Sequence, residues 1–88
     1  MTASQPHFRT ATLELIAFLI AHKTYPTDTE SHGPRKTFVL FADAKECHRL
    51  RALFETQGPN VNATDFYLAL DRAREIVKTG IIPKEARV

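Results

Sequence analysis

The chain has 88 residues, of which 43% are hydrophobic and 25% are charged, and its formal net charge is +2. A chain of this length and composition forms one small globular domain, which excludes an intrinsically disordered or multidomain protein. The single cysteine, Cys47, excludes an internal disulfide framework, and no apolar run approaches the roughly 20 residues of a membrane-spanning helix.

The first helix is the most apolar element of the chain. Residues 1–9 are polar and aperiodic, so we expect a flexible arm there. Thr10 or Thr12 can cap a helix that ends near His22. The helix carries one apolar stripe of Leu13, Ile16, Ala17 and Ile20, and an opposite one of Leu15, Phe18 and Leu19. A helix that is apolar nearly all round must be covered nearly all round.

A β-hairpin is expected next. Thr37–Ala42 is rich in β-branched and aromatic residues, which favours a buried strand. Its partner would be an edge strand over Lys23–Thr29, where Pro26 is tolerated, although a plain loop is an alternative. A turn around Ser31-His32-Gly33-Pro34 would join the two strands.

Two capped helices complete the domain. Asp43 and Glu46 form a capping-box pattern at the start of a helix over Ala44–Thr56. Asn62 caps a third helix, which Gly80 ends. The predicted fold is therefore α+β, with an N-terminal helix, a hairpin and two helices packed on the first. The single domain spans residues 10–82, and residues 83–88 form a charged tail.

This pattern resembles a family of small bacterial and phage domains of unknown function. The resemblance spans about residues 8–79 and depends on packing and capping positions. They are Phe8, Thr10, Leu15-Ile16-Ala17-Phe18-Leu19, Phe38-Val39-Leu40-Phe41 with Asp43, and Val61 before Phe66-Tyr67-Leu68-Ala69-Leu70. The resemblance implies a fold and no functional residue. The family usually has a glycine closing the first helix, where this chain has Lys23-Thr24.

The sequence offers no clear metal, cofactor or catalytic motif. The four histidines, His7, His22, His32 and His48, do not form pairs at i, i+3 or i, i+4 spacing. Cys47 lies on an apolar helical arc and is better interpreted as a core residue than as a nucleophile. We therefore expect no cofactor and no small-molecule substrate. A small enzyme with scattered active-site residues is a minor alternative.

Two binding surfaces are candidates, and the choice between them stays open at this point. The first is an apolar protein interface, through which the chain would associate with itself or with another protein; its residues are Leu15, Phe18, Leu19 and Leu68. The second is a basic surface for nucleic acid on the hairpin and second helix, made of Arg35, Lys36, Lys45, His48, Arg49 and Arg51. We expect a cytoplasmic, non-catalytic interaction module, with the apolar interface as the first hypothesis.

Overall fold

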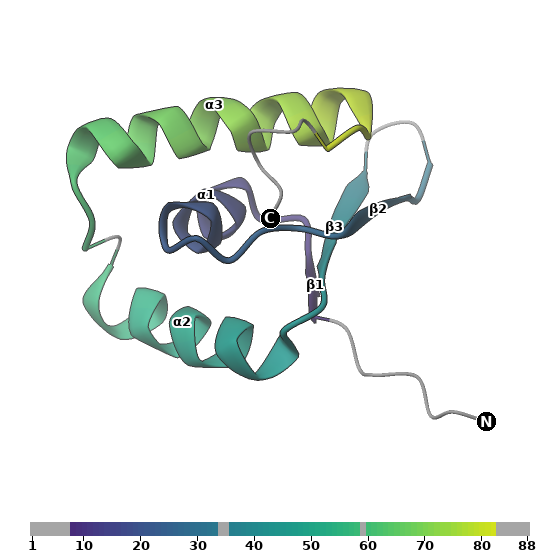
Figure 1. The fold of residues 1–88 in the computed structure, drawn as a ribbon. Coiled ribbons are helices and arrows are strands. Elements are labelled where there is room, and N and C mark those ends of the chain that lie inside the picture. The colour runs from purple at the N-terminus through teal and green to yellow at the C-terminus, as the bar shows by residue number, and fades with distance from the viewer. Residues whose placement is uncertain (1–7, 34–35, 59, 83–88) are drawn as a thin grey trace.

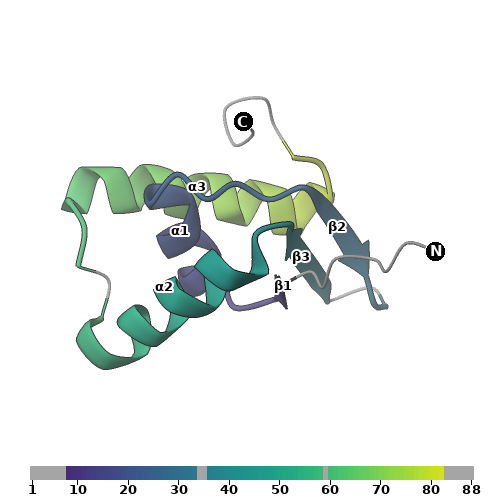
Figure 2. The same ribbon diagram turned by 60° about the horizontal axis from the view of Figure 1, so that its bottom comes forward.

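The fold places one helix between two others and beside a small sheet. The computed structural model describes residues 8–33, 36–58 and 60–82. The elements are β1 (Phe8–Thr10), α1 (Leu13–Ala21), β2 (Asp28–Ser31), β3 (Thr37–Phe41), α2 (Ala44–Gln57) and α3 (Ala63–Thr79). Figure 1 and Figure 2 show α1 between α3 and α2, with the sheet closing a third side. The α+β class is confirmed.

The predicted order of elements is wrong at its beginning, because a strand precedes the first helix. β1 pairs with β3, with Phe8 opposite Phe41 and Thr10 opposite Val39, so the antiparallel sheet has the order β1-β3-β2. Phe8 and Thr10 are buried while Arg9 between them is exposed. Packing of Phe8 on Phe41 therefore turns part of the expected arm into an edge strand. Residues 1–7 and the tail 83–88 lie outside the described residues.

The partner strand of the hairpin begins later than expected. β2 starts at Asp28, because residues 22–24 end α1 and residues 25–27 connect this helix end to the strand. Lys23 takes a left-handed conformation with φ 63°, and its N–H donates to the Ile20 carbonyl while the Thr24 N–H donates to the Leu19 carbonyl. These two bonds form a Schellman motif, in which lysine occupies the position that usually belongs to glycine. Residues 23–27 are thus a helix ending and a connection.

The core is built around α1. Its central residues, Ile16 to Leu19, are fully buried, and Leu15 and Ile20 are only 7% and 4% exposed. The sheet, α2 and α3 contribute the other fully or nearly fully buried side chains, which include Val39, Phe41, Cys47, Leu50, Ala69, Ala73 and Ile76. The sheet, α2 and α3 thus cover both apolar stripes of α1 within a single chain.

The predicted N-cap residues of the two later helices are confirmed, but the Glu46 half of the capping box is not, because the Glu46 carboxylate accepts from Arg49 instead. Thr12 occupies the N-cap position of α1 without a capping hydrogen bond. The Asp43 carboxylate accepts a hydrogen bond from the Glu46 N–H, and the Asn62 side chain accepts from the Thr64 and Asp65 N–H groups. Gly80 ends α3 in the left-handed conformation, with φ 73°. In the described part of the chain, no helix combines the length and the apolar character needed to cross a membrane.

The left-handed lysine yields a prediction about stability. A left-handed conformation costs a residue with a Cβ roughly 1–2 kcal/mol, whereas glycine adopts it freely but loses more backbone entropy on folding. We expect Lys23→Gly to raise the free energy of unfolding by about 1 kcal/mol, measured by urea denaturation.

The control for this substitution is Glu75→Gly, at an exposed position within α3. Glycine in a right-handed helix should lower the free energy of unfolding by about 1 kcal/mol. If both substitutions destabilise the protein equally, the strain assigned to Lys23 is not there.

Candidate functional site

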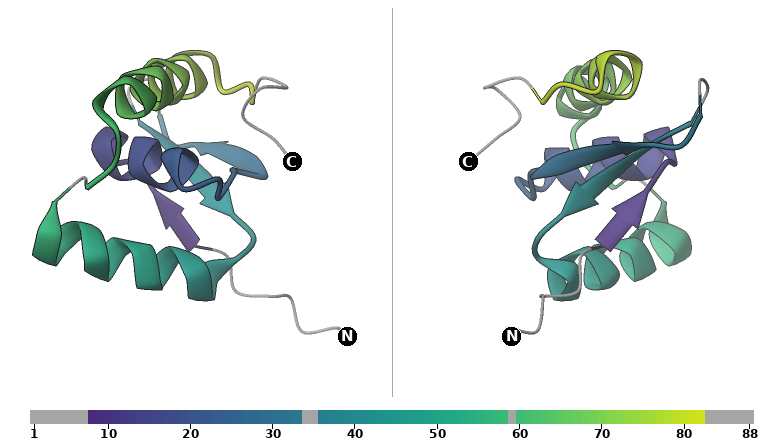
Figure 3. Two further views of the ribbon diagram at one scale, coloured as in Figure 1. Left: turned by 60° about the vertical axis from the view of Figure 1, so that its left-hand side comes forward. Right: turned by 90° about the vertical axis from the view of Figure 1, so that its right-hand side faces the viewer.

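The face of the sheet that points away from the helices carries the first part of the site. Figure 3 shows the helices on one side of the three strands. Val39 and Phe41 point into the core, so the alternating Phe38 and Leu40 point to the opposite face. The strand register places Arg9 and Asp28 beside Leu40, and Glu30 beside Phe38, on this outer face. No helix of the described chain covers it.

An aromatic ring lies at the centre of charged groups on this face. The half-buried Phe38 ring has the Arg9 guanidinium 4.9 Å and the Lys36 ammonium 5.3 Å from its centroid. The His32 ring meets it edge-on at 5.1 Å. One Glu30 carboxylate oxygen lies 2.8 Å from Arg9 Nη1 and 2.6 Å from His32 Nε2. We call these five residues the Phe38 cluster.

Glu30 is the electrostatic centre of the Phe38 cluster. The hydrogen bond from His32 is the main cause that lowers the pKa of the Glu30 carboxyl below its usual 4.5, and Coulombic interactions with His32 and Arg9 add to it. Because an ionised carboxylate only accepts hydrogen bonds, Nε2 of His32 must carry the proton. Glu30 thereby holds Arg9 and His32 over the aromatic ring.

A hollow of about 430 Å³ opens between the sheet and the end of α2. β1, the start of α1, Lys36, Phe38 and the last turns of α2 surround it. Aromatic and aliphatic side chains line its inner part, namely Phe8, Leu15, Phe38 and Phe54. Its charged lining consists of three cations and one carboxylate: Arg9, Lys36, Arg51 and Glu55. We call this space the sheet–helix hollow.

The exposed face of α2 adds further basic residues beside this hollow. Lys45, His48 and Arg49 are all exposed, and the His48 ring meets Phe8 of β1 edge-on at 5.1 Å. Arg49 donates two hydrogen bonds to the Glu46 carboxylate, which lower the pKa of that carboxyl and raise the pKa of Arg49. Such solvent-exposed ion pairs are weak, so an incoming anion can replace the carboxylate.

The structure brings only part of the predicted basic surface to one place. Lys36 and Arg51 line the same hollow although they belong to different elements. Arg51 Nε donates to Glu55 across one helical turn, at 3.1 Å. Lys45, His48 and Arg49 occupy the neighbouring face of α2. Arg35 lies outside the described residues.

Four residues of the Phe38 cluster were missed by the sequence analysis: Arg9, Glu30, His32 and Phe38. Arg9 was assigned to a flexible arm, and Phe38 was counted only as part of a buried strand. The alternation of Thr37, Val39 and Phe41 with Lys36, Phe38 and Leu40 was a usable signal, because alternate residues of a strand face opposite sides. No comparable local signal marks His32.

The predicted apolar interface is largely wrong. Leu15 is 7% exposed, and Phe18 and Leu19 are fully buried within the single chain. The reason is that α2 and α3 both pack against α1, and the Phe18 ring lies 5.1 Å from the Phe54 ring of α2. Only Leu68 is available, at 52% exposure on α3, beside Tyr67 at 68%.

The buried cysteine has low reactivity as a nucleophile. Burial, followed by the negative charges of Asp43 and Glu46, raises the pKa of the Cys47 thiol to about 11. The thiol is therefore protonated at neutral pH, and a protonated thiol is a poor nucleophile. Among the described residues, no three histidine, cysteine, aspartate or glutamate side chains lie close enough together to hold a metal ion.

Comparison of the chain with protein-family models, curated proteins and solved structures found no match. The resemblance drawn from packing and capping positions therefore stays a prediction.

The Phe38 cluster predicts a specific pH dependence of stability. Folding lowers the pKa of Glu30, so its contribution is present above pH 4.5 and is lost as the pH falls through the folded-state pKa. We expect Glu30→Gln to lower the free energy of unfolding at pH 6, with a difference from the wild type that shrinks below pH 4.5. Urea denaturation across this pH range measures it.

Glu75→Gln is the matched control, because the side chain of this exposed glutamate has no ion pair in the described part of the chain. It should show little difference from the wild type at either pH. A Glu30→Gln difference that is constant down to pH 3 would contradict the assigned role of Glu30.

Proposed function

We propose that this protein is a non-catalytic nucleic-acid-binding module, and that its contact surface is the sheet–helix hollow together with the adjoining face of α2. Arg9, Lys36 and Arg51 are the principal phosphate ligands in this proposal. Lys45 and Arg49 extend the positive surface along α2. Phosphate contacts of this kind hold a nucleic acid without reading its sequence.

The observation that carries the proposal is the convergence of cations from separate elements. Arg9 comes from β1, Lys36 precedes β3 and Arg51 belongs to α2, yet all three line one hollow. Arg9 is paired with Glu30 and Arg51 with Glu55, and because these pairs are exposed and weak, phosphates can replace the carboxylates. A formal net charge of only +2 for the whole chain makes such a local excess informative. The aromatic rings in the same hollow match the combination of charge and π surface that nucleic-acid sites use.

The proposal predicts that Lys36 contributes to nucleic-acid binding. Lys36→Gln should weaken binding of a fluorescent single-stranded oligonucleotide of about twelve nucleotides, and it should reduce the slope of log K against log salt by roughly 0.7. Arg51→Gln should act in the same way. Fluorescence anisotropy at several salt concentrations gives both quantities.

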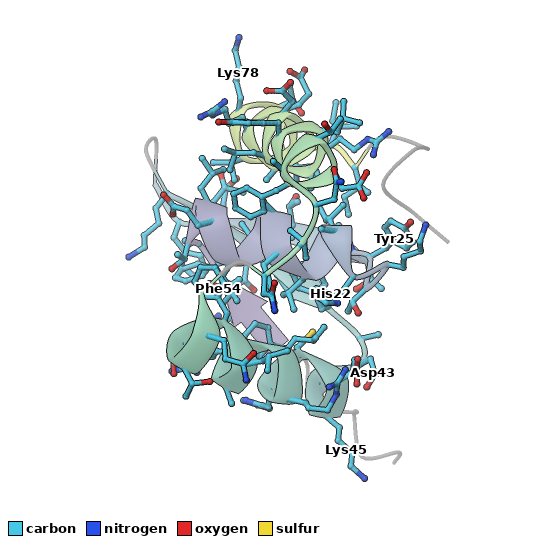
Figure 4. All side chains as sticks on the ribbon, turned by 90° about the vertical axis from the view of Figure 1, so that its left-hand side faces the viewer. His22, Tyr25, Asp43, Lys45, Phe54 and Lys78 are labelled. Carbon is cyan, nitrogen blue, oxygen red and sulfur yellow. The ribbon has the colours of Figure 1, made fainter. Side chains whose placement is uncertain are left out.

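Lys78→Gln supplies the control. Lys78 projects from α3 on the far side of the molecule from Lys45 on α2, as Figure 4 shows, and it does not line the sheet–helix hollow. The substitution makes the same charge change, so it should leave the affinity and the salt slope almost unaltered. Equal losses at Lys36 and Lys78 would mean that only the total charge matters, and would refute the assigned surface.

Self-association is a second candidate function, and of the residues predicted for it only Leu68 is exposed. Leu68 and Tyr67 are neighbouring exposed residues of α3. Leu68 borders a hollow of about 140 Å³ whose lining combines Ile20, Ala21 and Tyr25 with the charged residues Lys23, Asp65 and Arg72. Exposed apolar residues at such a depression are typical of protein contacts. This surface lies away from the sheet–helix hollow, so the two candidates are compatible.

Self-association predicts that the wild type sediments as a dimer at high concentration and that Leu68→Lys sediments as a monomer. The inserted charge would have to be desolvated in an apolar contact, which is costly. Sedimentation velocity measures both species. A wild type that stays monomeric at the highest accessible concentration would exclude this candidate and leave the nucleic-acid proposal untouched.

A further inference from the structure

We infer that the sheet–helix hollow receives an unpaired base, so that the preferred ligand of this module is single-stranded rather than duplex nucleic acid. This inference depends on the proposed function, and it adds the strandedness of the ligand.

Aromatic rings border the hollow from both faces of the sheet, with Phe38 on the outer face and Phe8 on the face that packs on the core. Phe38 and Phe54 are half-buried in its walls, and Phe8 and Leu15 lie deeper, at 6% and 7% exposure. A base that is paired and stacked within a duplex cannot present its face to such recessed rings. The Arg9 guanidinium and the Lys36 ammonium lie over the Phe38 ring, so an unpaired base that enters the hollow displaces one of these side chains when it stacks on the ring. Bases stack in this way on aromatic side chains in single-strand-binding proteins.

The size and polar groups of the hollow suit one base with its phosphates. A volume of about 430 Å³ falls within the usual range for sites that enclose small organic groups. Thr12 lines the hollow at the N-cap of α1, and its side chain makes no capping hydrogen bond. Its hydroxyl is therefore available to the edge of a base, while Lys36 and Arg51 can contact the flanking phosphates.

The charge on the outer sheet face disfavours a duplex lying across all three strands. Asp28 and Glu30 of β2 lie on the same face as Arg9 and Phe38. A duplex broad enough to cover the sheet would bring its phosphates against these two carboxylates. A single strand can instead follow the side formed by β1 and α2, where cations outnumber carboxylates.

The experiment compares three fluorescein-labelled probes of the same length by anisotropy at low salt. The probes are single-stranded thymidine oligonucleotide, a duplex, and an abasic strand that keeps every phosphate but lacks the bases. We expect the single strand to bind at least tenfold more tightly than either of the others. Phe38→Leu should weaken single-strand binding roughly 5- to 150-fold, the range for loss of one stacked base.

Tyr67→Leu is the matched control for the loss of a ring. Tyr67 is 68% exposed on α3 and does not line the sheet–helix hollow, so its substitution should leave binding unchanged. A second measurement does not depend on substitutions. A 2-aminopurine base placed centrally in the single strand should change its fluorescence on binding to the wild-type protein, because it becomes stacked.

The remaining outcomes separate the inference from the proposed function. Equal affinities for the single strand, the duplex and the abasic strand, with loss of binding in Lys36→Gln, would overturn the inference and leave the proposed function standing. Tighter binding of the duplex would do the same. Failure of all three probes to bind at low salt would overturn both.

Discussion

The enclosure of α1 is the constraint on which the rest of the structure depends. This nine-residue helix has apolar side chains on nearly every side, so burying only one face would leave the other in water. The sheet, α2 and α3 each cover one part of it. Because every inner surface is used for this purpose, binding must take place on outer surfaces or where two covering layers meet.

The sheet–helix hollow is such a meeting place. β1 and β3 cover one side of α1 and α2 covers another, and the junction between them leaves Phe8 and Leu15 slightly accessible at its base. Long side chains from both layers reach the rim. Arg51 and Lys36 are thereby close in space although 15 positions separate them in the chain. The same packing that buries the core creates the concave surface, its aromatic walls and its charged rim.

The candidate site could be predicted only in part. Lys36 and Arg51 were identified because cations on the polar face of a helix or at the base of a hairpin are visible in the sequence. Arg9 was not, since a three-residue strand has too little periodicity to be recognised. Phe38 carries an alternation that places it outward, but only the known position of the helices shows which of the two faces is outward.

The sequence by itself determined the local features: the starts of α2 and α3 at Asp43 and Asn62, the end of α3 at Gly80, and the central strand β3. These depend on hydrogen bonds and conformational preferences within a few residues. Only the tertiary structure decided that Phe8 begins a strand and that Phe18 is shielded within one copy. Both follow from contacts between segments far apart in the chain, and such contacts leave no local pattern to recognise.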